Sequence, residues 1–272
     1  MLALFSCKKP IDFSFTERNQ TIYLPPTALP DTLDKSIYTY YDFNTSIGGW
    51  YEISQRCSWS GTIQKVIKRA GTGALKVELR KADIPNGHRS ELGMEPSNKN
   101  ADGWYAFALH FPPEYISDSM EESIVQWHAQ PDMPGEVNGS APVFLGVVDN
   151  KYILELRTDP KKTTIQGDWT YKRIDLGPID IGKWADWVFH IKWAYDNTGI
   201  LEIWKNKVKV ISRINLPNSF NDATYPYFKI GIYRYGWSTM PENPIKVRTV
   251  YVDEVKIGDG TANLEKMSSV IN

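Results

Sequence analysis

Side chains that can transfer protons and attract an anion are gathered in one β-rich segment, residues 227–235, with the sequence YFKIGIYRY. Successive side chains of a strand point to opposite faces, so three apolar residues share one face: Phe228, Ile230 and Ile232. The opposite face carries a cation, a position without a side chain and two phenols: Lys229, Gly231, Tyr233 and Tyr235. A phenol can donate or accept a proton, and an ammonium group attracts an acid. The pattern therefore predicts a groove that holds an anionic sugar chain.

Two shorter motifs place further polar side chains on strand faces. In NGHRSEL (residues 86–92) a turn precedes a strand that puts Arg89 and Glu91 on one face, where a simple surface ion pair is the alternative interpretation. In SIVQWHA (residues 123–129) Gln126 and His128 share a face about 6.6 Å apart at the rise of a strand. Polar groups on a covered face need partners or a ligand, so we expect both motifs to contribute to a site.

The elements that must position these residues are short β-rich segments separated by turn signals. We expect strands over residues 36–43, 74–80, 104–111, 123–129, 143–148, 152–157, 184–193, 200–211, 225–235 and 246–257. Turn signals such as Asn86-Gly87, Asn138-Gly139 and Pro217-Asn218 separate them. No long stretch with helical periodicity competes with these expected strands. The spacing predicts an all-β fold, a two-sheet β-sandwich of the concanavalin-like jelly-roll type.

Composition limits the range of partners. The chain has 272 residues, 42% of them hydrophobic, and a formal net charge of −1. One large all-β domain can bury a core of that size, and we expect a monomer. A nearly neutral chain gives no overall field for nucleic acid, so affinity for an acidic ligand must come from a local group of cations.

The ends of the chain have a different character from its body. Residues 1–7 resemble the end of a bacterial lipoprotein signal, cut short, with Cys7 as the residue that becomes lipidated. Residues 8–35 contain several prolines and read as a tether, residues 36–260 as the sandwich, and residues 261–272 as a C-terminal tail. We therefore expect a lipid-anchored protein of the bacterial cell envelope, periplasmic or at the cell surface, with Cys7 as its only link to the membrane.

A family resemblance rests on three motifs in this order: His88-Arg-Ser-Glu-Leu92, Gln126-Trp-His128 and Lys229-Ile-Gly-Ile-Tyr233. Together they resemble the β-jelly-roll polysaccharide lyases, which include glucuronan lyase and heparin lyase I. The likeness covers residues 36–258. The chain has little spare length for the thumb-like insertion of heparin lyase I, so the compact glucuronan lyase type is the more similar one.

The resemblance implies β-elimination at a uronic acid of an acidic polysaccharide, with no cofactor required for the chemistry. A base removes the C5 proton, the carboxylate is neutralised, and an acid protonates the leaving O4. Tyr233 would supply the acid and could also be the base, with His128 or His88 as the other candidates for the base. Arg89 and Gln126 would hold the carboxylate.

Four further residues are assigned to substrate binding. Lys229 is four residues from Tyr233, about 13 Å along a strand, and is expected at a neighbouring subsite together with Glu91. Tyr235 and Trp237 continue the face of Tyr233 and could stack on sugar rings. Relatives of this type often bind one structural calcium ion, and Asp222 is the candidate ligand, although it also fits an ordinary turn residue.

Two other classes of protein remain open at this point. A glycosidase needs two carboxylates roughly 5–9.5 Å apart, whereas Glu91 and Glu95 would be about 13 Å apart on one strand. A lipid-anchored carbohydrate-binding protein without catalysis would use the same sandwich and the same aromatic residues. Among lyase substrates glucuronan is the first choice, with heparin, other glycosaminoglycans and ulvan as alternatives.

Overall fold

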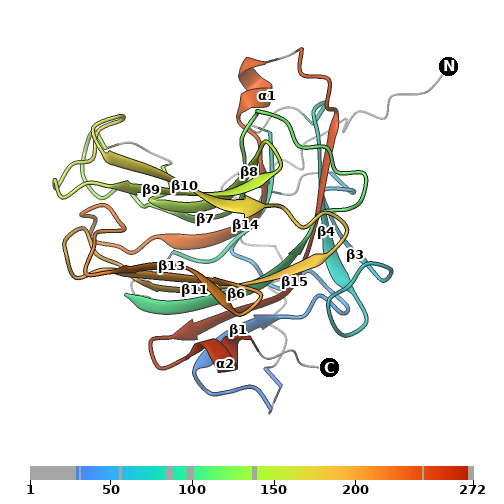
Figure 1. The fold of residues 1–272 in the computed structure, drawn as a ribbon, viewed down its shortest axis with the longest axis horizontal. Helices are drawn as coiled ribbons and strands as arrows, with labels where there is room; N and C mark the ends of the chain where they lie inside the picture. Colours follow the sequence, from blue (N-terminus) through green and yellow to red (C-terminus); the bar gives the residue numbers. More distant parts are fainter. Residues whose placement is uncertain are drawn as a thin grey trace, which may run out of the picture.

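Two antiparallel sheets stacked face to face make up the computed structural model (Figure 1). It describes residues 29–30, 32–54, 57–83, 88–96, 101–136, 140–240 and 242–268. The expected all-β jelly-roll sandwich is confirmed. The proposed signal, with Cys7, and most of the tether lie outside the described residues, so anchoring stays a prediction from sequence. Within the described ranges, no helix is long and apolar enough to cross a membrane.

The first sheet has eight strands in the order β13-β12-β11-β6-β15-β4-β3, with β1 paired to β15. Its strands are β1 (Ile37–Tyr41), β3 (Gly61–Gln64), β4 (Ala74–Arg80), β6 (Asp102–His110), β11 (Trp184–Lys192), β12 (Ile200–Lys205), β13 (Val208–Ile214) and β15 (Val247–Asp259). In β11 and β12 buried residues alternate with less buried ones along much of the strand, as in half-covered strands.

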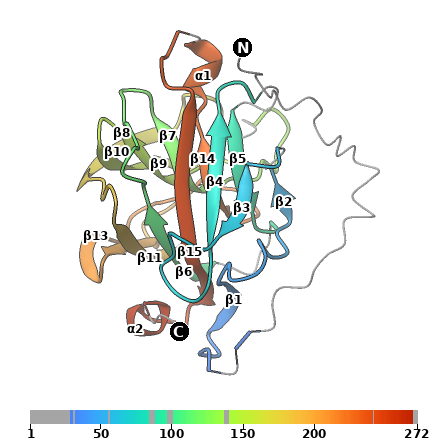
Figure 2. The same cartoon turned by 90° about the vertical axis from the view of Figure 1, so that its right-hand side faces the viewer.

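The second sheet has seven strands in the order β10-β9-β8-β7-β14-β5-β2. Its strands are β2 (Glu52–Ile53), β5 (Arg89–Gly93), β7 (Glu122–His128), β8 (Val143–Val148), β9 (Lys151–Thr158), β10 (Thr170–Pro178) and β14 (Tyr227–Tyr233). β14 lies between β7 and β5 (Figure 2), so the three motifs singled out from the sequence occupy adjacent strands.

The main core fills the space between the two sheets. Phe228, Ile230 and Ile232 of β14 are buried there, as their alternation predicts, together with Trp127 of β7 and Phe189 of β11. The ring centroids of Trp127 and Phe189 are 4.8 Å apart, so aromatic rings bridge the sheets. The polar residues of the same strands must therefore lie on the outer face of the seven-stranded sheet.

Two short helices lie outside the sandwich. α1 (Gly236–Thr239) follows the end of β14, and α2 (Leu264–Met267) packs on the outer face of the eight-stranded sheet (Figure 1). Asn263 caps α2 by accepting a hydrogen bond from the backbone N–H of Lys266, and Met267 is buried. The segment after residue 260 is therefore part of the folded unit as far as residue 268.

The strand pattern differs from the expectation in several places. The segment 200–211 is a hairpin, β12 and β13, because Asn206 and Lys207 both take positive φ and reverse the chain. β10 was not expected at all. Its residues are mostly exposed, since it is the edge strand of its sheet and has no strictly apolar face to mark it.

Candidate active site

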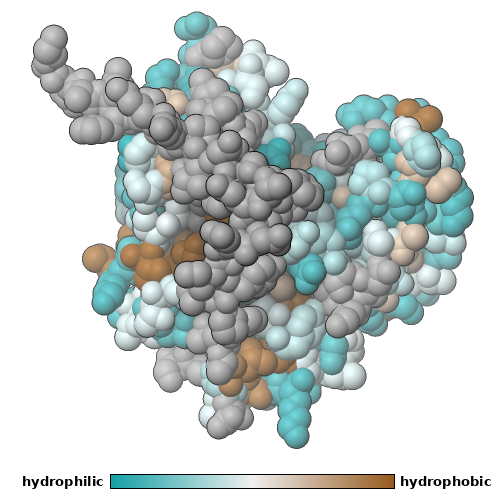
Figure 3. Space-filling view, turned by 180° about the vertical axis from the view of Figure 1, so that it is seen from behind, coloured by the Kyte–Doolittle hydropathy of each residue, from teal (hydrophilic) through white to brown (hydrophobic). Residues whose placement is uncertain are grey.

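A row of registered residues crosses the outer face of the seven-stranded sheet. In order from β2 to β10 it contains Glu52, Gly93, Lys229, Gln126, Phe144, Glu155 and Arg173, and we call it the central row. Six strand spacings give it a length of about 29 Å. Seen from behind, the upper outline of the molecule is hollowed between the part that carries α1 and the lobe at the β10 end of this sheet (Figure 3).

Arg89 and Tyr233 face each other across β5 and β14 in a second row. The guanidinium carbon of Arg89 lies 4.3 Å from the centroid of the Tyr233 ring, and both side chains are half-buried. The row continues through Ser123 and Gly146, which are both buried, and a Cβ on Gly146 would lie 3.0 Å from the Phe144 ring. The structure thus brings together the proposed acid and one proposed carboxylate-binding residue.

Gly231 lets two polar side chains meet across β14. Glu91 and Gln126 come from the strands on either side, and the Gln126 amide donates a hydrogen bond of 2.5 Å to the Glu91 carboxylate. Gly231 has a φ of +148°, and a Cβ there would lie 2.1 Å from the carbonyl oxygen of Ser90. No other residue type fits this position.

Lys229 is buried, which differs from the exposed subsite contact that its sequence position indicated. Its side chain is 1% exposed, and its ammonium group lies 3.0 Å from the Glu52 carboxylate and 3.3 Å from that of Glu91. Burial acts to raise the pKa of Glu52, but the Lys229 ammonium, with the Ser54 hydroxyl and Arg89, lowers that pKa below its usual value. Lys229 is therefore first an internal counter-ion, and Glu91 is 2% exposed beside it.

His128 lies at the far end of this face from Tyr233. Its Nδ1 donates to the carbonyl oxygen of Ala129 at 2.8 Å, which leaves Nε2 as an acceptor, and burial lowers the pKa of the imidazole. However, His128 pairs with Tyr227, whereas Tyr233 pairs with Ser123. Ser123 and His128 are five residues apart on β7, about 17 Å at the rise of a strand. The two proposed proton-transfer groups cannot act on one sugar together.

His88 packs against Trp237 of α1, with ring centroids 5.7 Å apart. The Nδ1 atom of His88 lies 3.0 Å from the hydroxyl of Ser238, and burial lowers the pKa of the ring. Trp237 is 2% exposed, with the edge of its ring against His88, so the expectation that it stacks on sugar is wrong. The strand ends at Tyr233, so the alternation does not continue to Trp237. Tyr235 is exposed, and its ring lies 6.4 Å from that of Tyr233.

Several residues of this face were not selected from the sequence, and Glu52 and Tyr227 are the ones beside Lys229 and His128. Glu52 lies on a strand of only two residues, too short to give a pattern. Tyr227 alternates with Lys229 and Tyr233, which was a usable signal, and its ring lies 5.3 Å from that of His128. Burial raises the pKa of Tyr227, and the Glu52 and Glu91 carboxylates add to the effect, so this phenol stays protonated near neutral pH.

Asp222 has two acidic neighbours, Asp132 and Glu136, and the three offer oxygen atoms within 4.8 Å of one another. Burial raises the pKa of Asp222 to about 7, and the charges of Glu136 and Asp132 contribute. Three carboxylates are the donors that calcium prefers, so this group fits the ion implied by the sequence resemblance. It lies ahead of β14 and shares no residue with the face that carries Tyr233.

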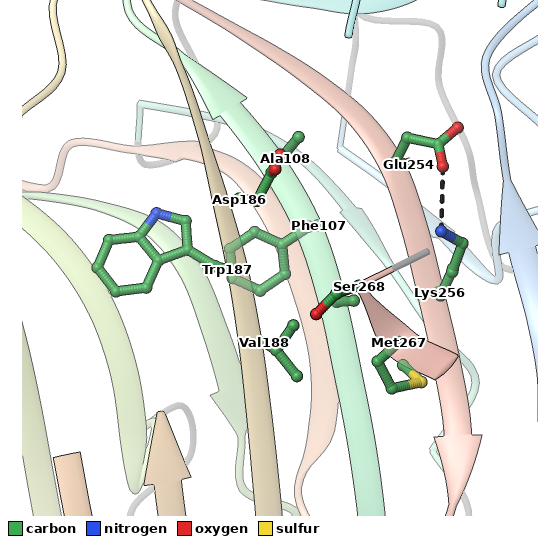
Figure 4. Close-up of a pocket in the computed structure, with 10 residues that line it drawn as sticks. Phe107, Ala108, Asp186, Trp187, Val188, Glu254, Lys256, Met267 and Ser268 are labelled. Carbon is green, nitrogen blue, oxygen red and sulfur yellow. Dashed lines mark hydrogen bonds and ion pairs between the residues drawn. The ribbon is translucent and has the colours of Figure 1, made fainter. Parts of the chain in front are cut away.

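A small pocket on the opposite side of the molecule offers no comparable chemistry. It lies beneath α2 on the eight-stranded sheet, and Figure 4 shows Met267 and Ser268 over Val188 and Phe107. Its charged groups already have partners, since Lys256 pairs with Glu254 at 3.0 Å, and Asp186 pairs with Arg69. The outer face of the seven-stranded sheet is therefore the candidate active site.

Comparison with known proteins gives one matching family and several similar solved structures. A family model described as polysaccharide lyase matches residues 42–256. An endo-β-1,4-glucuronan lyase from the fungus Trichoderma reesei is similar in structure, with a TM-score of 0.69, 21% identity, and coverage of 82% of this chain and 95% of that one. The PL-14 alginate lyase from Aplysia kurodai gives a TM-score of 0.51, 11% identity, and coverage of 73% and 86%. At these identities the solved structures show a shared fold. No curated protein sequence matches the chain.

Proposed function

Because the chain belongs to the polysaccharide lyase family, we propose that it cleaves a uronate polysaccharide, glucuronan first, by β-elimination on the outer face of the seven-stranded sheet. The observation that carries this proposal is the Arg89 guanidinium 4.3 Å from the ring of Tyr233, with the exposed Tyr235 ring 6.4 Å from that of Tyr233. A proton-transfer group and a cation for the carboxylate are then next to each other.

Tyr233 serves as both base and acid in this mechanism. As phenolate beside the Arg89 cation, it removes the proton from C5, and the electron pair delocalises onto the uronate carboxylate. The C4–O4 bond then breaks, a double bond forms between C4 and C5, and O4 takes the proton from the Tyr233 hydroxyl. The phenolate is restored, so protons and charges balance without a second residue.

The stereochemistry of the sugar supports glucuronan among the candidate substrates. In glucuronate and mannuronate, the C5 proton and O4 lie on the same side of the ring, so one residue can reach both. In guluronate and iduronate they lie on opposite sides, which calls for two groups. The separation of about 17 Å between the rows of Tyr233 and His128 supports the single-residue mechanism.

Product analysis tests the reaction type. Incubation with glucuronan should release oligosaccharides that absorb ultraviolet light, because elimination leaves a double bond conjugated to the carboxylate at the new non-reducing end. A panel with mannuronan, guluronan and heparin should show glucuronan as the best substrate. Saturated products with new reducing ends would indicate a hydrolase, and an intact polymer that binds would indicate a carbohydrate-binding protein.

We further propose that Asp132, Glu136 and Asp222 hold a calcium ion with a structural role. Without the ion, the raised pKa of Asp222 means that stability falls as the pH rises from about 4, where a free Asp titrates, through 7. Calcium at about 100 times its dissociation constant should add about 2.7 kcal/mol at pH 8.

The measurement is the melting temperature at pH 8 with EDTA and with calcium. Calcium should raise it for the parent and for Asp168→Asn, an exposed acid elsewhere, but much less for Asp222→Asn. An equal increase in melting temperature for all three proteins, or no increase for the parent, would contradict the calcium site.

A further inference from the structure

A second polar cluster lies on the same face, at the β9–β10 edge of the sheet. It contains Glu155 and Arg157 of β9 with Tyr171 and Arg173 of β10, and we call it the β9–β10 cluster. Glu155 and Arg173 are the last members of the central row, which leads from Lys229 through Gln126 and Phe144. The roles proposed above for Tyr233 and its neighbours make no use of it.

One buried carboxylate holds two guanidinium groups in place there. Glu155 is 2% exposed, and its oxygens lie 2.6 Å from Nη2 of Arg157 and 2.6 Å from Nη2 of Arg173. The Arg157 guanidinium also donates to the carbonyl oxygen of Ala141 at 2.9 Å. Two cations share this one anion, so these three residues carry a net charge of +1. Their geometry is fixed before any ligand arrives.

The upper surface of the cluster is aromatic. The guanidinium carbon of Arg157 lies 5.1 Å from the ring of Phe144 and 5.8 Å from that of Tyr171. Phe144 belongs to a small apolar cluster with Ala141 and Ile153, separate from the main core. The Tyr171 side chain is half exposed, and its hydroxyl donates to Glu155. An exposed ring beside fixed cations suits a sugar with a carboxylate.

Glu121 is the competing anion at this place. Its carboxylate pairs with Nη2 of Arg173, and the side chains of Arg173 and Glu121 are 43% and 33% exposed. An exposed pair of this kind contributes little to stability. A ligand carboxylate that also reaches Arg157 can therefore displace Glu121 from Arg173.

We infer that the β9–β10 cluster is a distal subsite that binds the carboxylate of a uronate several sugar units from the bond being cleaved. This inference rests on the proposed function, because it assumes an acidic polysaccharide that crosses this face of the sheet. Four strand spacings separate β14 from β10, about 19 Å, so only a chain that crosses β7, β8 and β9 reaches the cluster. The subsite thereby selects long chains over short ones.

The experiment compares Arg173→Ala with the parent on glucuronan and on the shortest oligosaccharide that is still cleaved. Arg173→Ala should raise KM for the polymer about tenfold, the effect of losing a charged hydrogen bond, with kcat unchanged. KM for the short oligosaccharide should not change. Glu121→Gln should lower KM for the polymer, because it removes the competing carboxylate. Lys209→Ala, an exposed paired cation on the other sheet, is the matched control and should change neither.

Binding is measured separately, so that the subsite and the lyase activity can fail independently. In the Tyr233→Phe background, affinity electrophoresis in glucuronan should show weaker retention after Arg173→Ala and normal retention after Lys209→Ala. This result would support the subsite even if the parent produced no unsaturated ends. Equal KM values for Arg173→Ala and the parent on the polymer, or an equal rise on short and long chains, would overturn the subsite while leaving the lyase function intact. Melting temperatures verify that each variant is folded. If Arg173→Ala is not folded, Arg173→Lys, which keeps the charge, is compared with the parent in its place.

Discussion

Tyr233→Phe should reduce turnover on glucuronan by about 10²–10⁴-fold, the usual loss when a general acid or base is removed. The substitution removes one oxygen and keeps the ring against which the Arg89 guanidinium lies at 4.3 Å. The fold and the affinity for the polymer should therefore persist. Turnover is measured as the initial rate at which ultraviolet absorbance increases, and polymer binding is measured by affinity electrophoresis.

The neighbouring phenol supplies the control for this variant. Tyr235 is exposed, and its ring lies 6.4 Å from that of Tyr233, so Tyr235→Phe makes the same chemical change a short distance away. It should retain nearly normal turnover. If Tyr233→Phe also retained it, Tyr233 would have no part in the proton transfer, and His128 and His88 would be the groups to replace next.

Lys229→Met should lower the free energy of unfolding by about 3–5 kcal/mol, the usual cost of removing one partner of a buried ion pair. Lys229 is 1% exposed between the carboxylates of Glu52 and Glu91, and the substitution leaves both without a counter-ion. An exposed subsite cation would behave differently, with weaker substrate binding and little change in stability. Urea unfolding at pH 7 measures the difference.

The effect of Lys229→Met on stability should depend on pH. Lys229 holds the pKa of Glu52 below its usual value, so the stability from this contact is complete above about pH 4.3, where a free Glu titrates. It is lost as the pH falls through the lowered pKa. The difference between parent and Lys229→Met should therefore shrink in acid.

Two further proteins complete the comparison. Adding Glu52→Gln and Glu91→Gln to Lys229→Met should restore much of the stability, because the unpaired charges are gone. Lys151→Met, which breaks an exposed pair with Asp175, should cost at most about 1 kcal/mol. A Lys229→Met protein as stable as the parent at pH 7 would show that the buried pair contributes nothing.

The sequence alone determined the class of fold and which side chains of β14 lie on each of its faces. Alternation along β14 assigned Phe228 and Ile230 to the core and Tyr233 to the outer face, because a strand offers only two sides. The same rule placed Arg89 and Gln126 on that face from two other strands. The edge strand β10 escaped notice because its exposed residues show no apolar face.

Only the tertiary structure decided which of these residues meet, since strand register depends on partners that are distant in sequence. Register put Arg89 opposite Tyr233 and moved His128 to the other end of the face. The neighbouring strands decided burial. Lys229 stands in an outward position, but carboxylates from β2 and β5 enclose it. A pattern along one strand states the side on which a residue lies, whereas its neighbours across the sheet determine whether it is exposed, paired or able to reach a substrate.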